Sequence, residues 1–253
     1  MKNEPLPALL RTVPMFAELD TALLGQLAAM TEASEAAHGA ELCRQGEFAA
    51  HLHVLLAGQV TLSGTAPDGA AAVVEIISAP GHFVLAAVLT QMPYLMTAHA
   101  LTPVRLLRVD AGGLRTLVEQ APPLALSLLQ SQARDFRAMV RQVRDLKLRT
   151  TAQRLGCYLL ALVRDPLATS AELRLPFEKG LLAGRLGCRQ ENLSRAFAVL
   201  RAMGVETSGT RVWLHDIAKL QSYAAPDELA DSVREPANEG VDQAGSAQGC
   251  SAA

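Results

Sequence analysis

The sequence predicts an α+β protein in which an N-terminal β jelly roll is joined by a long helix to a C-terminal winged helix-turn-helix. Between residues 37 and 110, short apolar runs alternate closely with turn residues, a pattern typical of an antiparallel barrel or jelly roll. From residue 122 to about 148, apolar residues recur at helical spacing. A compact helical unit with an internal glycine follows from residue 178 to 203. The chain of 253 residues is long enough for one large domain or two small ones.

The first 120 residues begin with helix and continue as strands. We expect residues 6–36 to be helical, with Asp20 capping the segment that carries Leu23, Leu24 and Leu27. The Asp68-Gly69 step indicates a hairpin turn. The apolar runs that predict strands are Leu52–Leu56, Val60–Leu62, Val73–Ile77 and Val104–Val109.

The long helix carries a narrow apolar seam with a 4-3-4-3 spacing, as in a coiled coil. The seam consists of Leu129, Ala133, Phe136, Val140 and Val143. A seam this narrow favours a dimerisation helix over residues 121–148. The alternative is a helix that packs its stripe on its own domain.

Residues 149–225 predict a winged helix-turn-helix. After a helix over 150–163 and a short strand over Leu173–Leu175, a short helix ends at Gly187, where the turn needs a left-handed residue. A second helix from about Gln190 to Met203 buries Leu193, Phe197 and Leu200. The hairpin over Val205–Leu214, which turns at Ser208-Gly209-Thr210, would form the wing.

The outer face of the second helix has the chemistry of a DNA-recognition helix. Arg195 can bond guanine bidentately, Glu191 can accept from cytosine, and Ser194 can contact a base. Gln190 lies on the same first turn, and the candidates for phosphate contacts are Arg189, Lys179 and Arg211. The alternative is a helical hairpin with a solvated polar face.

The net charge of −2 hides three unlike segments. Residues 1–144 hold 10 basic and 12 acidic side chains, and residues 145–225 hold 12 basic and 7 acidic ones. Residues 226–253 hold one basic and six acidic side chains without apolar periodicity, so we expect a disordered acidic tail there. The predicted DNA-binding region is therefore the basic part of the chain.

Several classes of protein are disfavoured. No apolar run approaches the roughly 20 residues of a membrane span, and the N-terminus has no signal-peptide pattern. The four cysteines form neither a disulfide framework nor a CxxC metal site. Hydrolase, metalloprotease and Walker motifs are missing, so we expect a cytoplasmic protein that is not an enzyme.

The chain resembles the Crp/Fnr family of bacterial transcription regulators up to about residue 224. The resemblance rests on Val13-Pro14-Met15-Phe16 with Leu19, on the turn glycines Gly46, Gly58 and Gly81, and on Glu191-Asn192-Leu193-Ser194-Arg195. The last motif matches the Glu-x-x-Ser-Arg signature of the Fnr-like branch, while Gln190 stands where the Crp-like branch usually has Arg. The resemblance implies a cyclic-nucleotide-binding-type jelly roll over residues 1–120 that senses an effector. It also implies a symmetric dimer, a TTGAT-like inverted repeat as the DNA site, and RNA polymerase as a partner.

Family members that bind cyclic nucleotides carry Phe-Gly-Glu and an Arg before Ser/Thr-Ala. Here Phe83-Val84-Leu85 replaces the first motif, and Met96 precedes Thr97-Ala98, so we expect no cAMP binding. Residues 1–42 contain no cysteine, so we expect no iron–sulfur cluster. An apolar effector pocket is predicted instead, formed by Phe83, Leu85, Val88, Leu89, Tyr94 and Met96.

This pocket sequence is similar to that of the nitric-oxide-responsive denitrification regulators of the family, which are thought to use haem. That similarity makes His82 a candidate axial ligand, against the alternative of a surface histidine. His51 and His53 lie on one face of a strand and could bind a metal, although solvated edge histidines are the commoner case. Two other functions stay open at this point. One is a haem-independent redox or ligand sensor, and the other is a scaffold or effector-binding protein with a vestigial helix-turn-helix.

Overall fold

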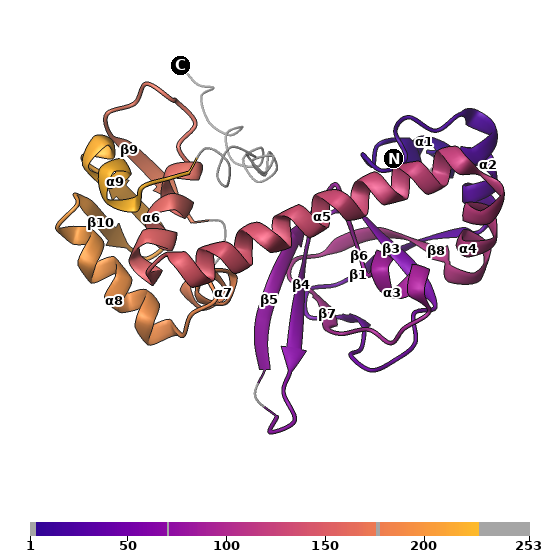
Figure 1. Ribbon diagram of the computed structural model, residues 1–253, viewed down its shortest axis with the longest axis horizontal. Coiled ribbons are helices and arrows are strands. Elements are labelled where there is room, and N and C mark those ends of the chain that lie inside the picture. The colour runs from indigo at the N-terminus through magenta and orange to yellow at the C-terminus, as the bar shows by residue number, and fades with distance from the viewer. Residues whose placement is uncertain (1–3, 70, 176–177, 228–253) are drawn as a thin grey trace, which may run out of the picture.

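A computed structural model describes residues 4–69, 71–175 and 178–227. It shows a β-rich N-terminal domain, the long helix α5 (Pro122–Leu148) and a mainly helical C-terminal domain (Figure 1). The architecture agrees with the predicted α+β fold. The predicted tail lies outside the described residues, apart from residues 226 and 227. None of the helices in the described part of the chain is both long and apolar enough to cross a membrane.

The N-terminal segment contains two short helices, α1 (Leu6–Arg11) and α2 (Thr21–Ala29). The Asp20 side chain accepts a hydrogen bond of 2.8 Å from the Leu23 amide, which confirms the predicted cap. The prediction of helix up to residue 36 is wrong, because β1 (Thr31–Ala36) is an edge strand paired antiparallel with β8 (Val104–Asp110). The segment lacks apolar residues at helical spacing, and pairing with β8 satisfies its backbone instead.

Two four-stranded sheets form the β domain, in the orders β1-β8-β3-β6 and β2-β7-β4-β5. Their remaining strands are β2 (Glu41–Cys43), β3 (His51–Ala57), β4 (Gln59–Thr65), β5 (Ala71–Ser78), β6 (Gly81–Phe83) and β7 (Thr97–Ala100). Leu55 and Leu106 of the first sheet pack against Leu62 and Ala98 of the second, so one core lies between the sheets. This is the predicted jelly roll, and each of the four strands predicted for this domain lies within an observed one.

Helices cover the other face of the first sheet. Val54 and Leu107 pack there with α2, with α3 (Leu85–Thr90), with α4 (Ala111–Gln120) and with the start of α5. At the far end of the domain, β4 and β5 form a long hairpin whose turn contains Gly69 at φ +84°. That turn is the one predicted from Asp68-Gly69.

The first helix of the C-terminal domain starts three residues after α5 ends. The domain contains α6 (Thr151–Ala161), α7 (Lys179–Arg185), α8 (Gln190–Arg201) and α9 (Ile217–Ala224). A three-stranded sheet in the order β10-β11-β9 completes it, with β9 (Ala171–Arg174), β10 (Val205–Ser208) and β11 (Arg211–Leu214). Leu155, Leu182, Leu193 and Leu220 share one core, so all four helices pack together.

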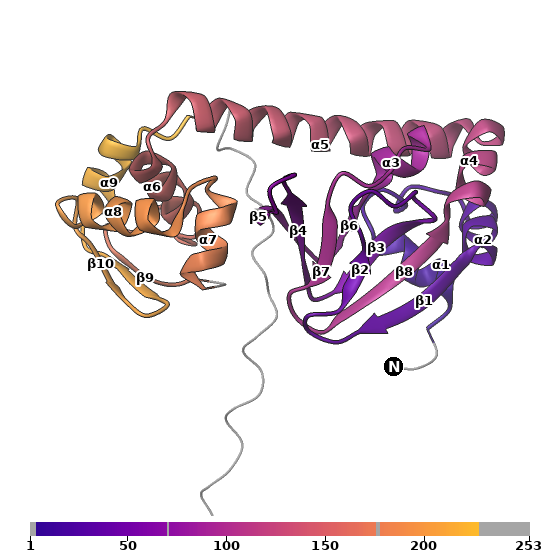
Figure 2. The same cartoon turned by 90° about the horizontal axis from the view of Figure 1, so that it is seen from below.

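The two domains touch through the β4–β5 hairpin. Helix α7 packs on β5, and both views show the two elements side by side (Figures 1 and 2). A Cβ placed on Gly184 in α7 would lie 2.9 Å from the Val73 Cβ and 3.1 Å from the Val73 carbonyl oxygen. Only a glycine at this position therefore lets the hairpin approach so closely.

Candidate DNA interface and sensor core

The turn between α7 and α8 has the geometry of a helix-turn-helix. Gly187 adopts φ +60°, the left-handed conformation that the sequence predicts there. Its amide donates to the Gly184 carbonyl at 2.9 Å, and the Cys188 amide donates to the Ala183 carbonyl at 2.9 Å. These bonds close the end of α7, and α8 starts three residues later.

Helix α8 buries one face and presents the other. Leu193, Phe197 and Leu200 are buried, as predicted from their spacing. Glu191, Ser194 and Arg195 are exposed on its first turns. The Ser194 hydroxyl donates to the Gln190 carbonyl of its own helix at 3.1 Å. The structure therefore brings the three predicted base-contacting residues together at the N-terminal end of one helix, where donors to a DNA groove are typically placed.

The predicted phosphate-contacting residues have different local settings. Arg189 is the exposed N-cap residue of α8, and Gln190 is exposed beside it. Arg211 lies 3.8 Å from the Glu172 carboxylate across the wing, with both side chains exposed. Lys179 extends its ammonium 5.2 Å above the centre of the Phe197 ring, so part of its side chain packs at the α7–α8 junction.

The residues of the predicted effector pocket do not line a single space. Phe83, Tyr94 and Met96 belong to the core between the sheets, whereas Leu85, Val88 and Leu89 belong to the core under the helices. The reason is α3, which turns its apolar side toward the helical layer as soon as β6 ends. Spacing along the sequence could not show this change of layer.

Helix α3 is entered and left through left-handed residues. Val84 has φ +65° and Gln91 has φ +56°. The left-handed region is unusual for a β-branched residue such as Val84 and costs on the order of 1–3 kcal/mol. The segment in which family members that bind cyclic nucleotides carry their Glu and Arg is therefore a strained one here, and it contains no charged side chain between Phe83 and Ala98.

The three histidines named from sequence have separate environments. The His82 Nε2 lies 3.1 Å from an Asp135 carboxylate oxygen of α5. His53 is buried and stacks on Phe83 at 4.8 Å between ring centres, while His51 meets it edge-on at 6.4 Å. Burial, with further contributions from His51 and Arg108, lowers the pKa of His53 to about 4.

A haem is not accommodated by this arrangement. The side chains between the two sheets are packed against one another, and the Nε2 of His82 is occupied by Asp135. Among the described residues no group of three His, Cys, Asp or Glu side chains is placed to hold a metal. We therefore give haem no role in the account of this protein.

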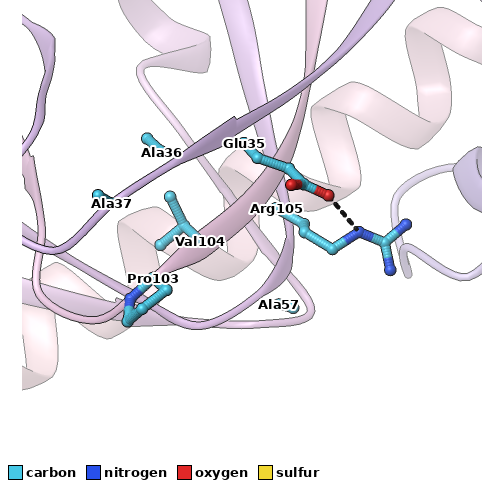
Figure 3. Close-up of a pocket in the computed structure, with 7 residues that line it drawn as sticks. All are labelled: Glu35, Ala36, Ala37, Ala57, Pro103, Val104 and Arg105. Carbon is cyan, nitrogen blue, oxygen red and sulfur yellow. Dashed lines mark ion pairs between the residues drawn. The ribbon is translucent and has the colours of Figure 1, made fainter.

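Two hollows open on the surface of the described chain. One, of about 500 Å³, is lined by Ala36, Ala57 and Val104 and is bordered by the Glu35–Arg105 ion pair, 3.8 Å long (Figure 3). The other, of about 430 Å³, lies between the end of α8 and β10, beside Arg201 and Thr207. Neither hollow contains a residue predicted from the sequence to bind effector or DNA.

Comparison with known proteins identifies both halves of the chain. Residues 34–121 match the cyclic nucleotide-binding domain family, and residues 153–223 match the Crp-like helix-turn-helix domain family. A candidate cyclic nucleotide binding protein from Ruegeria pomeroyi is 32% identical. The match covers 90% of this chain and all of that one, with a TM-score of 0.58. The protein belongs to the Crp/Fnr family of transcription regulators.

Two further relatives of this Crp/Fnr regulator are more distant. The CRP-like cAMP-activated global transcriptional regulator of Mycobacterium tuberculosis is 24% identical over 184 residues, which cover 71% of this chain and 82% of that protein. A candidate Crp/Fnr-family regulator from Eubacterium rectale shares the fold, with a TM-score of 0.66 at 16% identity over 84% of this chain and 98% of that one. The predicted Crp/Fnr family is confirmed by the two domain matches and by the 32% identical protein.

One structurally important residue was not found from the sequence. Arg154 of α6 donates to two main-chain carbonyls in other parts of the chain. No motif or spacing marks it, because one of its acceptors, Leu186, is 32 residues away and is a main-chain group of no particular residue type.

Proposed function

We propose that this Crp/Fnr regulator binds TTGAT-like inverted repeats as a homodimer, with Glu191, Ser194 and Arg195 contacting the bases. The observation that carries the proposal is the joint exposure of these three side chains at the N-terminal end of α8. Arg195 supplies a bidentate donor for guanine, and Glu191 accepts from the cytosine amino group. Gln190 adds a polar group on the first turn of α8, and Arg189, Lys179 and Arg211 would contact the backbone phosphates.

Helix α5 supplies the dimer interface in this proposal. Its inward face carries Leu124 and Leu128, which are buried on the sensor domain. The opposite face leaves Leu129, Phe136 and Val140 exposed at 65%, 61% and 49%, and Ala133 and Val143 continue the same row. A second copy of α5 would remove this row from water, which a monomer would leave exposed. Such a dimer bound at a promoter would also meet RNA polymerase.

The proposed effector is a small molecule other than cAMP. The phosphate of a cyclic nucleotide needs a cation, and Met96 and Leu85 stand where family members that bind it place their Arg and Glu. Residues 83–98 offer apolar side chains instead, which favours an uncharged effector. The resemblance of residues 83–98 to the nitric-oxide-responsive regulators makes nitric oxide the first uncharged effector to test, and because the packed core does not accommodate haem, its action is tested with and without added haem. Calorimetry with cAMP, and spectra near the Soret band before and after addition of haem and nitric oxide, distinguish the effector classes.

A duplex titration at several salt concentrations tests DNA binding. The dimer should prefer an inverted TTGAT repeat to a scrambled duplex, and log K should fall steeply with log salt, by about 0.9 per phosphate neutralised. Equal affinity for both duplexes would contradict the proposed site. A protein that bound neither duplex would overturn the DNA-binding function and favour a vestigial helix-turn-helix.

A further inference from the structure

We propose that Arg154 is a positioning residue that fixes the orientation of the helix-turn-helix relative to the dimerisation helix, and so sets the half-site spacing that the dimer accepts. The proposal rests on the proposed function, because it needs a dimer joined through α5 and recognition through α8. It concerns how the recognition helix is held, rather than which bases it contacts.

The joint between α5 and the C-terminal domain is very short. Helix α5 ends at Leu148, α6 starts at Thr151, and only Arg149 and Thr150 lie between them, both extended. Thr150 and Gln153 form a capping box that closes the start of α6. A rotation of the C-terminal domain about α5 therefore has to occur through the backbone angles of two residues.

Arg154 closes this joint from the side of the helix-turn-helix. Its NH1 donates to the Arg149 carbonyl, the C-cap of α5, at 2.8 Å. Its Nε donates to the Leu186 carbonyl, the C-cap of α7, at 3.0 Å. Helix C-termini leave carbonyls without intrahelical partners and carry partial negative charge, so one half-buried guanidinium satisfies two of them. The end of the dimer helix and the start of the recognition turn are thereby held by the same planar group.

Packing at the next residue reinforces this connection. A Cβ on Gly187 would lie 2.5 Å from the Leu146 Cδ2, so the recognition turn rests directly on the last turn of α5. Leu186 and Gly187 are thus held by a hydrogen bond and by a close contact, and both lead back to the α5 end. Helix α8 starts three residues after Gly187, which leaves it little freedom to move relative to α5.

Half-site spacing follows from this arrangement. In a symmetric dimer, the distance and angle between the two recognition helices determine which separation of half-sites fits both at once. A fork of fixed N–H directions holds two carbonyls at a set angle, which a single ammonium on a flexible stem cannot do. Loss of the fork should therefore relax the spacing, while each α8 keeps its own base contacts.

The experiment measures affinity for inverted repeats whose spacer changes in steps of one base pair. Wild-type protein should show one sharp optimum. Arg154→Met keeps an unbranched side chain but removes the hydrogen-bond donors. The preference of this variant for the optimal spacer over the neighbouring spacers should fall by about tenfold, while its affinity for a single half-site should stay within about twofold of wild type. Arg154→Lys, which keeps the charge and is the milder change if Arg154→Met folds poorly, should give an intermediate profile. Arg164→Met is the control, because Arg164 is an exposed arginine beyond the end of α6, and its loss should leave the optimum sharp.

The outcomes separate this inference from the proposed function. A uniform loss of affinity at all spacers in folded Arg154→Met and Arg154→Lys would show a merely structural residue and overturn the inference alone. An unchanged profile in both variants, or a wild-type profile without an optimum, would overturn it as well. A wild-type protein without specific binding to any duplex would overturn the proposed function, and the inference with it.

Discussion

Three side chains at the start of α8 carry the proposed recognition, and their setting explains why they are available. Leu193 and Phe197 anchor the helix from below, so Glu191, Ser194 and Arg195 project from a fixed support. In contrast, His53 in the sensor core is held by burial, with a ring nitrogen that has no hydrogen-bond partner. The three α8 side chains are thus exposed and available to a partner, whereas the His53 side chain is buried away from water.

Replacing Arg195 with Ala should weaken binding to the specific site by about 1–3 kcal/mol and flatten base preference at the position it contacts. The loss follows from the bidentate bond to guanine, which alanine cannot make. Competition titrations with single-base variants of the half-site measure it. Arg201→Ala, an exposed arginine at the far end of the same helix, should lower affinity without changing base preference. Full discrimination in Arg195→Ala would mean that another helix face contacts the bases.

Acidification should destabilise the sensor domain through His53. The pKa of the native ring is about 4, against 6.5 for an ordinary histidine, so between these values the unfolded chain binds more protons than the folded one. Stability should therefore fall as pH drops from about 6.5 toward 4, by up to about 3 kcal/mol. Thermal unfolding at pH 7, 6 and 5 tests this, and His53→Phe should show a smaller decrease in Tm. His38→Gln, which replaces an exposed histidine, should show the same fall in Tm with pH as wild type. If His53→Phe also showed the full fall in Tm, a group other than His53 would cause it.

Helices α5 and α7 each meet two different neighbours, and their sequences reflect both. Helix α5 is apolar toward its own domain near Leu124 and Leu128, but further along this face the contacts are polar, through Asp135 to His82 and through Gln142 to the Val74 carbonyl. Helix α7 contains glycine in its interior at position 184, where the β4–β5 hairpin touches it. In α7, a glycine that lowers the stability of the isolated helix allows close packing against the β4–β5 hairpin.

The cost of this fit can be measured at Gly184. Alanine there raises helix propensity by about 1 kcal/mol, but its Cβ meets Val73 and should push the hairpin away. We expect faster amide hydrogen exchange in β5 of Gly184→Ala and no gain in Tm. Gly180→Ala in the same helix meets only the Gln190 side chain at 3.6 Å, so it should raise Tm and leave β5 protected. Equal protection of β5 in both variants would show that the hairpin does not depend on the glycine.

At the scale of the whole molecule, charge and apolar surface are divided among segments with different roles. The described chain exposes a row of large apolar side chains along α5, while residues 145–225 hold 12 basic and 7 acidic side chains. The overall charge of −2 reflects neither feature, because residues 226–253 add six acidic side chains and one basic one. A dimer through α5 would bring two basic domains to one duplex.

Phe136→Lys should convert the dimer to a monomer and remove specific binding to the inverted repeat. Each copy would lose about 1.5–3 kcal/mol of apolar burial and place two charges together at the two-fold axis. Sedimentation equilibrium measures the change in mass. Gln130→Lys, an exposed substitution off the apolar row, should leave the dimer intact. A dimeric Phe136→Lys protein would place the interface on another surface.

The sequence by itself determined the jelly roll, the long helix and the helix-turn-helix, and it placed the proposed recognition residues on the exposed face of one helix. These follow from local patterns: short apolar runs alternate with turn residues, Leu193, Phe197 and Leu200 recur at helical spacing, and the turn requires a left-handed backbone at Gly187. Tertiary structure decided that residues 31–36 form a strand, that α3 divides the predicted pocket residues between two cores, and that Arg154 ties the turn to α5. Those features depend on pairing and packing between residues far apart in the chain, and on main-chain acceptors that carry no sequence signal.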